Sequence, residues 1–168
     1  MNPPVNDLAR LRQAHLRRLR SPLLFGLYLL GRLPSAFFMG IRLNSCTEDE
    51  AVVGLPFWWF TKNPFRSVYF AAQCAAAELS TGVLATTALQ GMGRVSMLVS
   101  HFEMEFVSKA TSRVRFTCRE GARLQAAVEE AVRTGEKQMV QVTAEGHDRA
   151  GELVSRASIT WYFRKKPR

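Results

Sequence analysis

Apolar and polar residues alternate along four stretches in the second half of the chain. Phe102, Met104 and Phe106, for example, are separated by charged residues. A period of two is typical of a strand that buries one face and exposes the other. The pattern predicts antiparallel strands over residues 101–106, 113–118, 138–145 and 153–163, with an intervening helix over 121–134, where apolar residues recur at helical spacing.

The first half contains two further stretches of this kind. Residues 41–47 form the first, residues 48–50 form a polar turn, and apolar positions alternate again from Val53 to Trp59. Together they predict a hairpin. Pro64 ends it, because proline lacks a backbone N–H and disfavours helix at the residue before it.

Residues 67–90 are rich in alanine and other small side chains and carry almost no charge. A helix that is apolar around most of its circumference must be covered on most sides, and small side chains let a sheet approach it closely. We therefore expect a central buried helix. The order of helix, two strands, buried helix and four strands indicates an α+β fold in which a curved antiparallel sheet wraps around that helix.

Residues 1–34 predict a basic helical extension that precedes one domain over residues 35–168. Leu8, Leu11 and Leu19 share one helical face opposite the arginines of this segment. Such a helix fits an anionic membrane surface or a place on the domain's own core, and we favour the second. The apolar run that follows is too short for a transmembrane helix, and the segment lacks the form of a secretory signal.

The formal net charge of +9 is concentrated at the two ends of the chain. Five arginines precede residue 21, and four basic residues follow residue 163. The nearly neutral body argues against a fold that reads nucleic acid, and favours a phosphorylated ligand, an anionic membrane surface or solubility as the reason for the charge. The three cysteines and three histidines are scattered, so we expect no metal site and a cytoplasmic, reducing compartment.

Glu78 is the only charged side chain between Arg66 and Arg94. A carboxylate in this apolar stretch should be partly desolvated, which raises its pKa toward the range useful for a general base. The alternative is a structural carboxylate that bonds Gln73 or a backbone group, or that faces a partner subunit.

Two segments resemble a known family: NPFRSVYFAAQCAAAELSTG over residues 63–82, and EMEFVSKA over residues 103–110. They are similar to the hotdog superfamily, and specifically to bacterial proteins of the domain of unknown function 4442 family, near the phenylacetyl-CoA thioesterase branch. The resemblance covers roughly residues 35–165. It implies a hotdog fold, with a curved sheet around a central helix.

The first segment departs from the family pattern of an asparagine, a loop, His-Gly-Gly and an acidic residue. Tyr69 stands at the histidine position, and Phe70 and Ala71 stand at the two glycines. Glu78 lies on the acidic position, nine residues after Tyr69, and Asn63 lies six residues before it.

The resemblance implies an acyl-CoA thioesterase-like hydrolase in which Glu78 activates water and Asn63 positions water or substrate. The backbone N–H groups of Phe70 and Ala71 would hold the oxyanion. The expected substrate contacts are Tyr69, Gln73, Lys109, Arg113 and Arg115. Coenzyme A would enter as part of the substrate, and no other cofactor is expected.

A binding module that holds a fatty acyl chain or acyl-CoA without hydrolysis is the alternative function. Its motivation is the bulk of the residues at positions 69–71. In either case we expect self-association, as a homodimer or a dimer of dimers, because single hotdog sheets usually pair edge to edge. Peripheral contact with an anionic membrane through the N-terminal helix stays open.

Overall fold

The computed structural model describes residues 5–166 of the 168-residue chain. Three helices open the fold: α1 (Val5–Leu19), α2 (Pro22–Arg32) and α3 (Pro34–Phe38). The remaining elements are β1 (Arg42–Cys46), β2 (Ala51–Leu55), the 3-10 turn η1 (Trp59–Thr61), α4 (Phe70–Ala88), β3 (Val95–Phe106), β4 (Val114–Cys118), α5 (Gly121–Thr134), β5 (Gln138–His147) and β6 (Leu153–Lys165).

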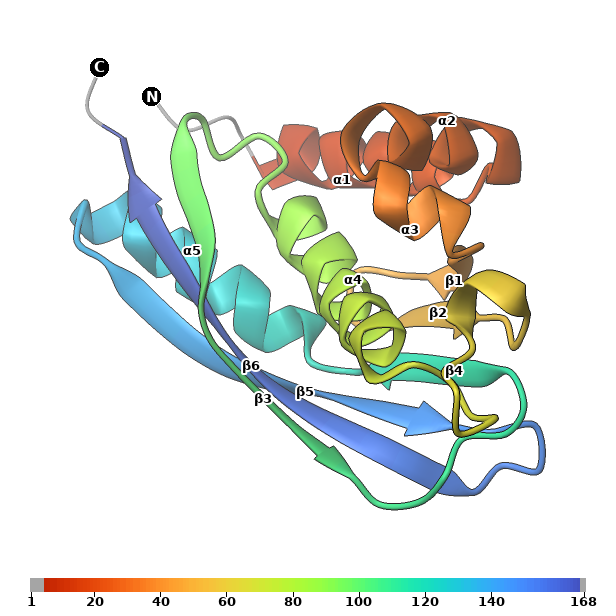
Figure 1. Cartoon of the computed structure of the whole chain (residues 1–168). Coiled ribbons are helices and arrows are strands. Elements are labelled where there is room, and N and C mark those ends of the chain that lie inside the picture. Colours follow the sequence, from red (N-terminus) through yellow and green to blue (C-terminus); the bar gives the residue numbers. More distant parts are fainter. Residues whose placement is uncertain (1–4, 167–168) are drawn as a thin grey trace.

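The strands form one antiparallel sheet in the order β1-β2-β4-β5-β6-β3. The sheet is curved, and α4 lies in its concavity with α5 beside it (Figure 1). The predicted α+β architecture is therefore confirmed: a curved antiparallel sheet wraps around one central helix. Helices α1, α2 and α3 lie together on the far side of α4 from β6 (Figure 1).

Helix α4 is buried along most of its length because its side chains are small. Ala72, Ala76, Ala77 and Ala85 have no exposed surface, and they let the sheet approach the helix backbone. The fully buried polar side chains of α4 have hydrogen-bond partners, as where the Trp161 indole N–H donates to Thr81 Oγ1 at 3.0 Å.

The second strand ends earlier than the alternation predicted. β2 stops at Leu55, because Pro56 has no backbone N–H to continue the ladder. The Thr61 hydroxyl then closes a 3-10 turn by donating to Pro56 O at 2.7 Å and accepting the Trp58 backbone N–H at 3.1 Å. Trp59, predicted to lie in the strand, belongs to this turn and is 78% exposed.

The N-terminal segment forms three helices, where the sequence analysis predicted one. Helix α1 packs on the domain's own core through Leu16, which is fully buried, and Leu19. Arg12 is also buried, and its guanidinium lies 3.3 Å from the Glu129 carboxylate of α5. Leu11, predicted to share the packing face, is instead 46% exposed.

Candidate functional site

One side of α4 is left only partly covered by the surrounding elements. Along it, exposed or half-buried residues occur on each helical turn as far as Glu78 and again two turns later: Phe70, Ala71, Cys74, Ala75, Glu78 and Thr86. We call these residues the open stripe of α4. Strand β3 runs next to the stripe, because Cys74 Sγ lies 3.3 Å from Met104 Sδ and the Phe70 and Phe106 ring centroids are 6.4 Å apart.

The N-terminus of α4 offers two unpaired backbone donors. Tyr69 is the N-cap residue, and its carbonyl accepts the N–H groups of Ala72 at 3.1 Å and Gln73 at 3.2 Å. Within the described chain, the N–H groups of Phe70 and Ala71 have no backbone acceptor, and no side chain caps this end. Free donors at the positive end of a helix dipole are suited to stabilise an oxygen that gains negative charge.

Glu78 lies on the same face of α4 as Ala71, seven residues further on. Seven residues are close to two helical turns, which separates the two backbones by about 10 Å. The Glu78 carboxylate itself lies on the Gly82 side of the residue, because a Cβ built at Gly82 would be 3.3 Å from Glu78 Oε1.

The Glu78 side chain lies at a cavity of about 580 Å³. Burial raises the pKa of its carboxyl, and within the described chain no ion pair or hydrogen bond offsets this shift. Gly82 leaves room for the carboxylate, because a Cβ there would lie 3.3 Å from Glu78 Oε1. The expectation that the carboxylate is desolvated is confirmed, and the alternative in which Gln73 bonds it is wrong.

The cavity is mostly apolar, and it extends from Glu78 toward the C-terminal half of α4. Four elements line it, and their residues are His15, Arg18, Leu19, Leu24, Phe25, Tyr28, Leu33, Glu78, Leu79, Gly82, Val83, Thr86, Gln90 and Met97. Helices α1 and α2 therefore form the cover of this cavity.

His15 is a polar cavity residue that the sequence analysis missed. Its Nε2 is buried without a hydrogen-bond partner in the described chain. Burial lowers its pKa, and the positive charge of Arg18 lowers it further. The available signal was its spacing: His15 lies four residues before Leu19, on the face of α1 that packs inward.

Asn63 shapes the loop before α4. Its Oδ1 accepts the backbone N–H groups of Phe65 at 3.0 Å and Ser67 at 3.1 Å, and also the Ser67 hydroxyl at 3.2 Å. These bonds fix the chain around Arg66, which has a positive φ of 59°. Asn63 thus sets the direction in which the chain enters the helix.

Gln73 and Tyr69 occupy different surroundings. Gln73 is buried on the opposite side of α4 from the open stripe, where it accepts the Ser155 hydroxyl at 2.9 Å and donates to Val68 O at 3.4 Å. These contacts give Gln73 a structural role. Tyr69 is 41% exposed, and its ring meets that of Phe70 edge to face at the start of the stripe.

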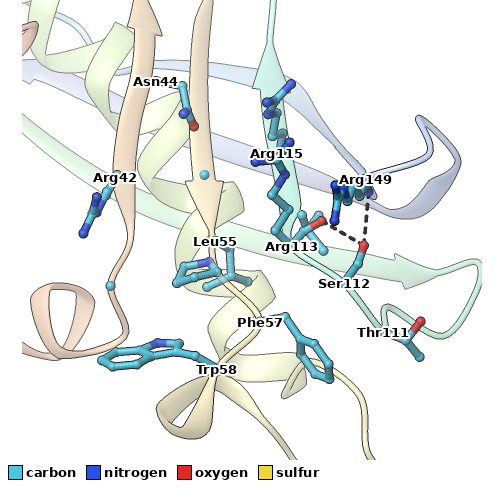
Figure 2. A pocket seen from close by; sticks show the side chains of 14 residues that line it. Arg42, Asn44, Leu55, Phe57, Trp58, Thr111, Ser112, Arg113, Arg115 and Arg149 are labelled. Atoms are coloured by element: carbon cyan, nitrogen blue, oxygen red, sulfur yellow. Dashed lines mark hydrogen bonds between the residues drawn. The ribbon is translucent and has the colours of Figure 1, made fainter.

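Arg113 and Arg115 are not brought together with Glu78. Val114 and Phe116 of β4 are fully buried toward α4, so the two arginines that alternate with them project from the opposite, outer face of the sheet. There they line a separate open groove of about 850 Å³ (Figure 2). Lys109 is exposed in the loop between β3 and β4.

Neither a metal site nor a membrane span is found in residues 5–166. In that part of the chain no three histidine, cysteine or acidic residues are grouped as metal ligands. No helix there is both long enough and apolar enough to cross a bilayer.

The match to a family model decides where the chain belongs. Residues 25–163 match the model described as Domain of unknown function (DUF4442). The protein belongs to the DUF4442 family. The match begins inside α2, so it includes part of the cover over the Glu78 cavity. No curated protein sequence shows significant similarity to this DUF4442 protein.

Solved structures show that this DUF4442 protein has the hotdog fold. A Pseudomonas aeruginosa protein of unknown function, named as a probable thioesterase, is similar with a TM-score of 0.73 and 21% identity, over 86% of this chain and 97% of that chain. A Chlorobaculum tepidum protein of unknown function has a TM-score of 0.74 and 16% identity, over 91% and 99%. A Haemophilus influenzae thioesterase has a TM-score of 0.60 and 13% identity, over 83% and 88%.

Proposed function

We propose that this protein hydrolyses an acyl thioester of coenzyme A, with Glu78 as the general base. One observation carries the proposal. A desolvated carboxylate without a partner lies two turns along the same helix face from two free backbone N–H groups. Structural neighbours that are named as thioesterases support the same class of reaction on this fold.

The proposed reaction uses both features of α4. Glu78 removes a proton from water, and the water oxygen attacks the thioester carbonyl carbon. The carbonyl oxygen becomes negatively charged and accepts hydrogen bonds from the Phe70 and Ala71 N–H groups. The carbon–sulfur bond then breaks, and Glu78 returns the proton to the thiolate of coenzyme A. Desolvation makes the carboxylate a stronger base, which favours the first step.

The apolar cavity beyond Glu78 is the proposed place for the acyl chain. A carbonyl held between Ala71 and Glu78 directs its acyl substituent along α4 into the space beneath α1 and α2. Ligand pockets are mostly apolar with a few polar groups that fix orientation, and this cavity has that composition. Asn63 acts in this proposal through the loop that positions the helix N-terminus.

The reaction is tested with a panel of acyl-CoA substrates and two variants. Glu78→Gln keeps the size of the side chain and removes the base, so we expect kcat/KM to fall by about 100-fold or more. Glu152→Gln removes an exposed carboxylate from the turn before β6 and should leave the rate unchanged. Equal rates for Glu78→Gln and the unsubstituted protein would remove Glu78 from the mechanism.

A second candidate function is acyl or acyl-CoA binding without hydrolysis. The observation that favours it is Phe70, whose aromatic ring stands 56% exposed at the helix N-terminus, where the family pattern has glycine. Such bulk restricts the approach of a carbonyl to the N–H groups. This function predicts that the unsubstituted protein and Glu78→Gln both bind an acyl-CoA tightly and that neither releases free coenzyme A. Hydrolysis of the acyl-CoA by the unsubstituted protein would exclude it.

A further inference from the structure

The groove on the outer face of the sheet is lined by four arginines from three separate parts of the chain. Arg42 belongs to β1, Arg113 and Arg115 belong to β4 and the loop before it, and Arg149 lies in the turn between β5 and β6. Figure 2 shows Arg113, Arg115 and Arg149 on one side of the groove and Arg42 across β2 from them.

The strand register produces the trough between these arginines. Gly54 of β2 is paired with Arg42 on one side and with Arg115 on the other. The two arginines are therefore two strand spacings apart, about 10 Å, and the glycine between them carries no side chain of its own. Asn44 lies across the glycine, since a Cβ at Gly54 would meet Asn44 Oδ1 at 2.4 Å. The missing side chain at Gly54 thus leaves the space on the floor of the groove that the Asn44 amide occupies.

The rim at the other end is held by Ser112. Its hydroxyl donates to the Arg113 carbonyl at 3.3 Å and accepts the Arg149 backbone N–H at 3.1 Å (Figure 2). The second of these bonds joins the β3–β4 loop to the β5–β6 turn. The backbones that carry Arg113 and Arg149 are therefore fixed relative to each other.

The four arginines lack acidic partners. Within residues 5–166, five other arginines form ion pairs with carboxylates, whereas Arg42, Arg113, Arg115 and Arg149 form none within 4.0 Å. Guanidinium groups gathered without counter-charges raise the local positive potential and attract anions. Their planar donor forks match the oxygens of a phosphate group.

One end of the groove is aromatic. The Trp58 indole is fixed by donating its N–H to Met39 O at 2.9 Å, and the ring remains 42% exposed. Pro56 and Phe57 line the groove beside it. A fixed and exposed aromatic face is suited to stack on a planar base.

We propose that this outer groove binds a phosphorylated nucleoside, with the phosphates on the arginines and the base on Trp58. The inference depends on the groove alone and does not require hydrolysis at Glu78. Two sources supply this chemistry: the nucleotide portion of a coenzyme A thioester, or a separate nucleotide.

Binding is tested by titrating the full-length protein with adenosine 3′,5′-bisphosphate, ADP and inorganic pyrophosphate. We expect the adenosine phosphates to bind, more weakly as salt rises, and pyrophosphate to bind at least ten-fold more weakly. The double variant Arg113→Ala/Arg115→Ala should weaken nucleotide binding at least ten-fold, because it removes two guanidinium groups that would donate charged hydrogen bonds to the phosphates. Trp58→Leu should weaken the nucleotides and leave pyrophosphate unchanged. Arg94→Ala, an exposed arginine outside the groove, is the matched control.

Two results would overturn the proposal. The first is nucleotide binding that the double arginine variant leaves intact while circular dichroism shows that it is folded. The second is pyrophosphate binding as tight as that of the nucleotides. Repeating the titration with Glu78→Gln separates this inference from the proposed hydrolysis, because a functional groove binds in that variant too.

The two nucleotide sources give different kinetics. If the ligand is part of the thioester, the arginine variant raises KM for acyl-CoA with kcat unchanged, and adenosine 3′,5′-bisphosphate competes with the substrate. If it is a separate nucleotide, the arginine variant leaves KM for acyl-CoA unchanged while it still loses nucleotide binding. Either result supports the groove as a nucleotide site.

Discussion

The Glu78 carboxylate makes no hydrogen bond or ion pair within the described chain that would stabilise the fold. Its carboxylate is desolvated and has no compensating partner within the described chain, and burial raises its pKa. A carboxyl with a raised pKa in the folded state keeps its proton to higher pH than it does in the unfolded chain. The folded state therefore loses stability as pH rises from about the unfolded pKa through the folded pKa.

Glu78→Gln should accordingly stabilise the protein at neutral pH. Near pH 4 both side chains are neutral, and the two proteins should unfold alike. Above the folded pKa the variant should be the more stable protein, and each 1 kcal/mol of difference raises Tm by about 2–4 °C in a domain of this size. Urea unfolding between pH 4 and pH 8 measures the difference, with Glu152→Gln as the exposed control. A variant less stable than the parent at pH 7 would show that the carboxylate has a structural role.

His15 has the opposite pH dependence. Burial and Arg18 lower its pKa in the folded state, so the unfolded chain takes up a proton first as pH falls. Stability present above pH 6.5 is therefore lost as the pH drops below that value toward the folded pKa. The His15→Gln variant lacks this titration, and its stability should fall less between pH 7 and pH 5. Unfolding free energies at both pH values test this, and parallel decreases in the two proteins would contradict it.

The surroundings of a single residue could be predicted where its neighbours in the sequence determine them. Glu78 stood out because no other charge lies within the apolar stretch around it, and the structure confirms its desolvation. Gln73 was assigned to the substrate, but its partner Ser155 lies 82 positions away, and such hydrogen bonds are set by the tertiary fold. His15 was missed because it belongs to a helix that the sequence analysis treated as an extension.

At the scale of elements, hydrophobic period predicted the strands and the central helix well. The sheet alternation of β4 and the small side chains of α4 each have a direct physical meaning, and both elements lie where expected. The aromatic residues after β2, up to Trp59, follow the same alternation and were predicted to continue the strand. Pro56 and the turn closed by Thr61 end the strand instead. Local hydrogen bonding decided the outcome at that point.

At Gly82 of α4, we expect one substitution to have opposite effects on helix stability and on catalysis. Gly82→Ala should stabilise an interior helical position by up to about 1 kcal/mol. Its Cβ would lie 3.3 Å from Glu78 Oε1, so the flexible carboxylate must move away. We expect Tm to stay or rise while kcat falls, because the base is displaced. Steady-state kinetics and thermal unfolding on the same samples give both quantities, and an unchanged kcat would show that the carboxylate position is not critical.

At the scale of the whole molecule, the sheet separates Arg113 and Arg115, on its outer face, from Glu78, on the side of α4. The sequence analysis grouped Arg113 and Arg115 with Glu78 as parts of one site. The alternation along β4 already argued against this grouping. Val114 and Phe116 face α4, so Arg113 and Arg115 must face the other side of the sheet. The position of α1 and α2 over the cavity could not be read from the sequence, since their apolar faces fit several partners equally well.

The other feature of the whole molecule is an open sheet edge. β3 is 12 residues long and pairs only with β6, so its other edge is unpaired within the described chain. Phe102 and Met104 pack only partly against the core, and Leu98 is 59% exposed. A long, unpaired and apolar edge favours pairing with another strand. We expect two copies to pair through β3, which also encloses the open stripe of α4 next to it.

Leu98→Lys tests this association, because lysine on an edge strand disfavours strand pairing. The matched control is Met139→Lys, which replaces a similarly exposed side chain, 55% against 59%, on the interior strand β5, which pairs with β6 at this position and with β4 further along. We expect the parent protein and the control to sediment as dimers or dimers of dimers. On dilution, Leu98→Lys should dissociate into monomers at a protein concentration at least ten-fold higher than the concentration at which the parent dissociates. If the partner completes the site, the specific activity of Leu98→Lys should also fall on dilution while that of Met139→Lys stays constant. A parent protein that sediments as a monomer at all concentrations would leave the β3 edge without this role, and the enclosure of Glu78 would then depend on α1 and α2 alone.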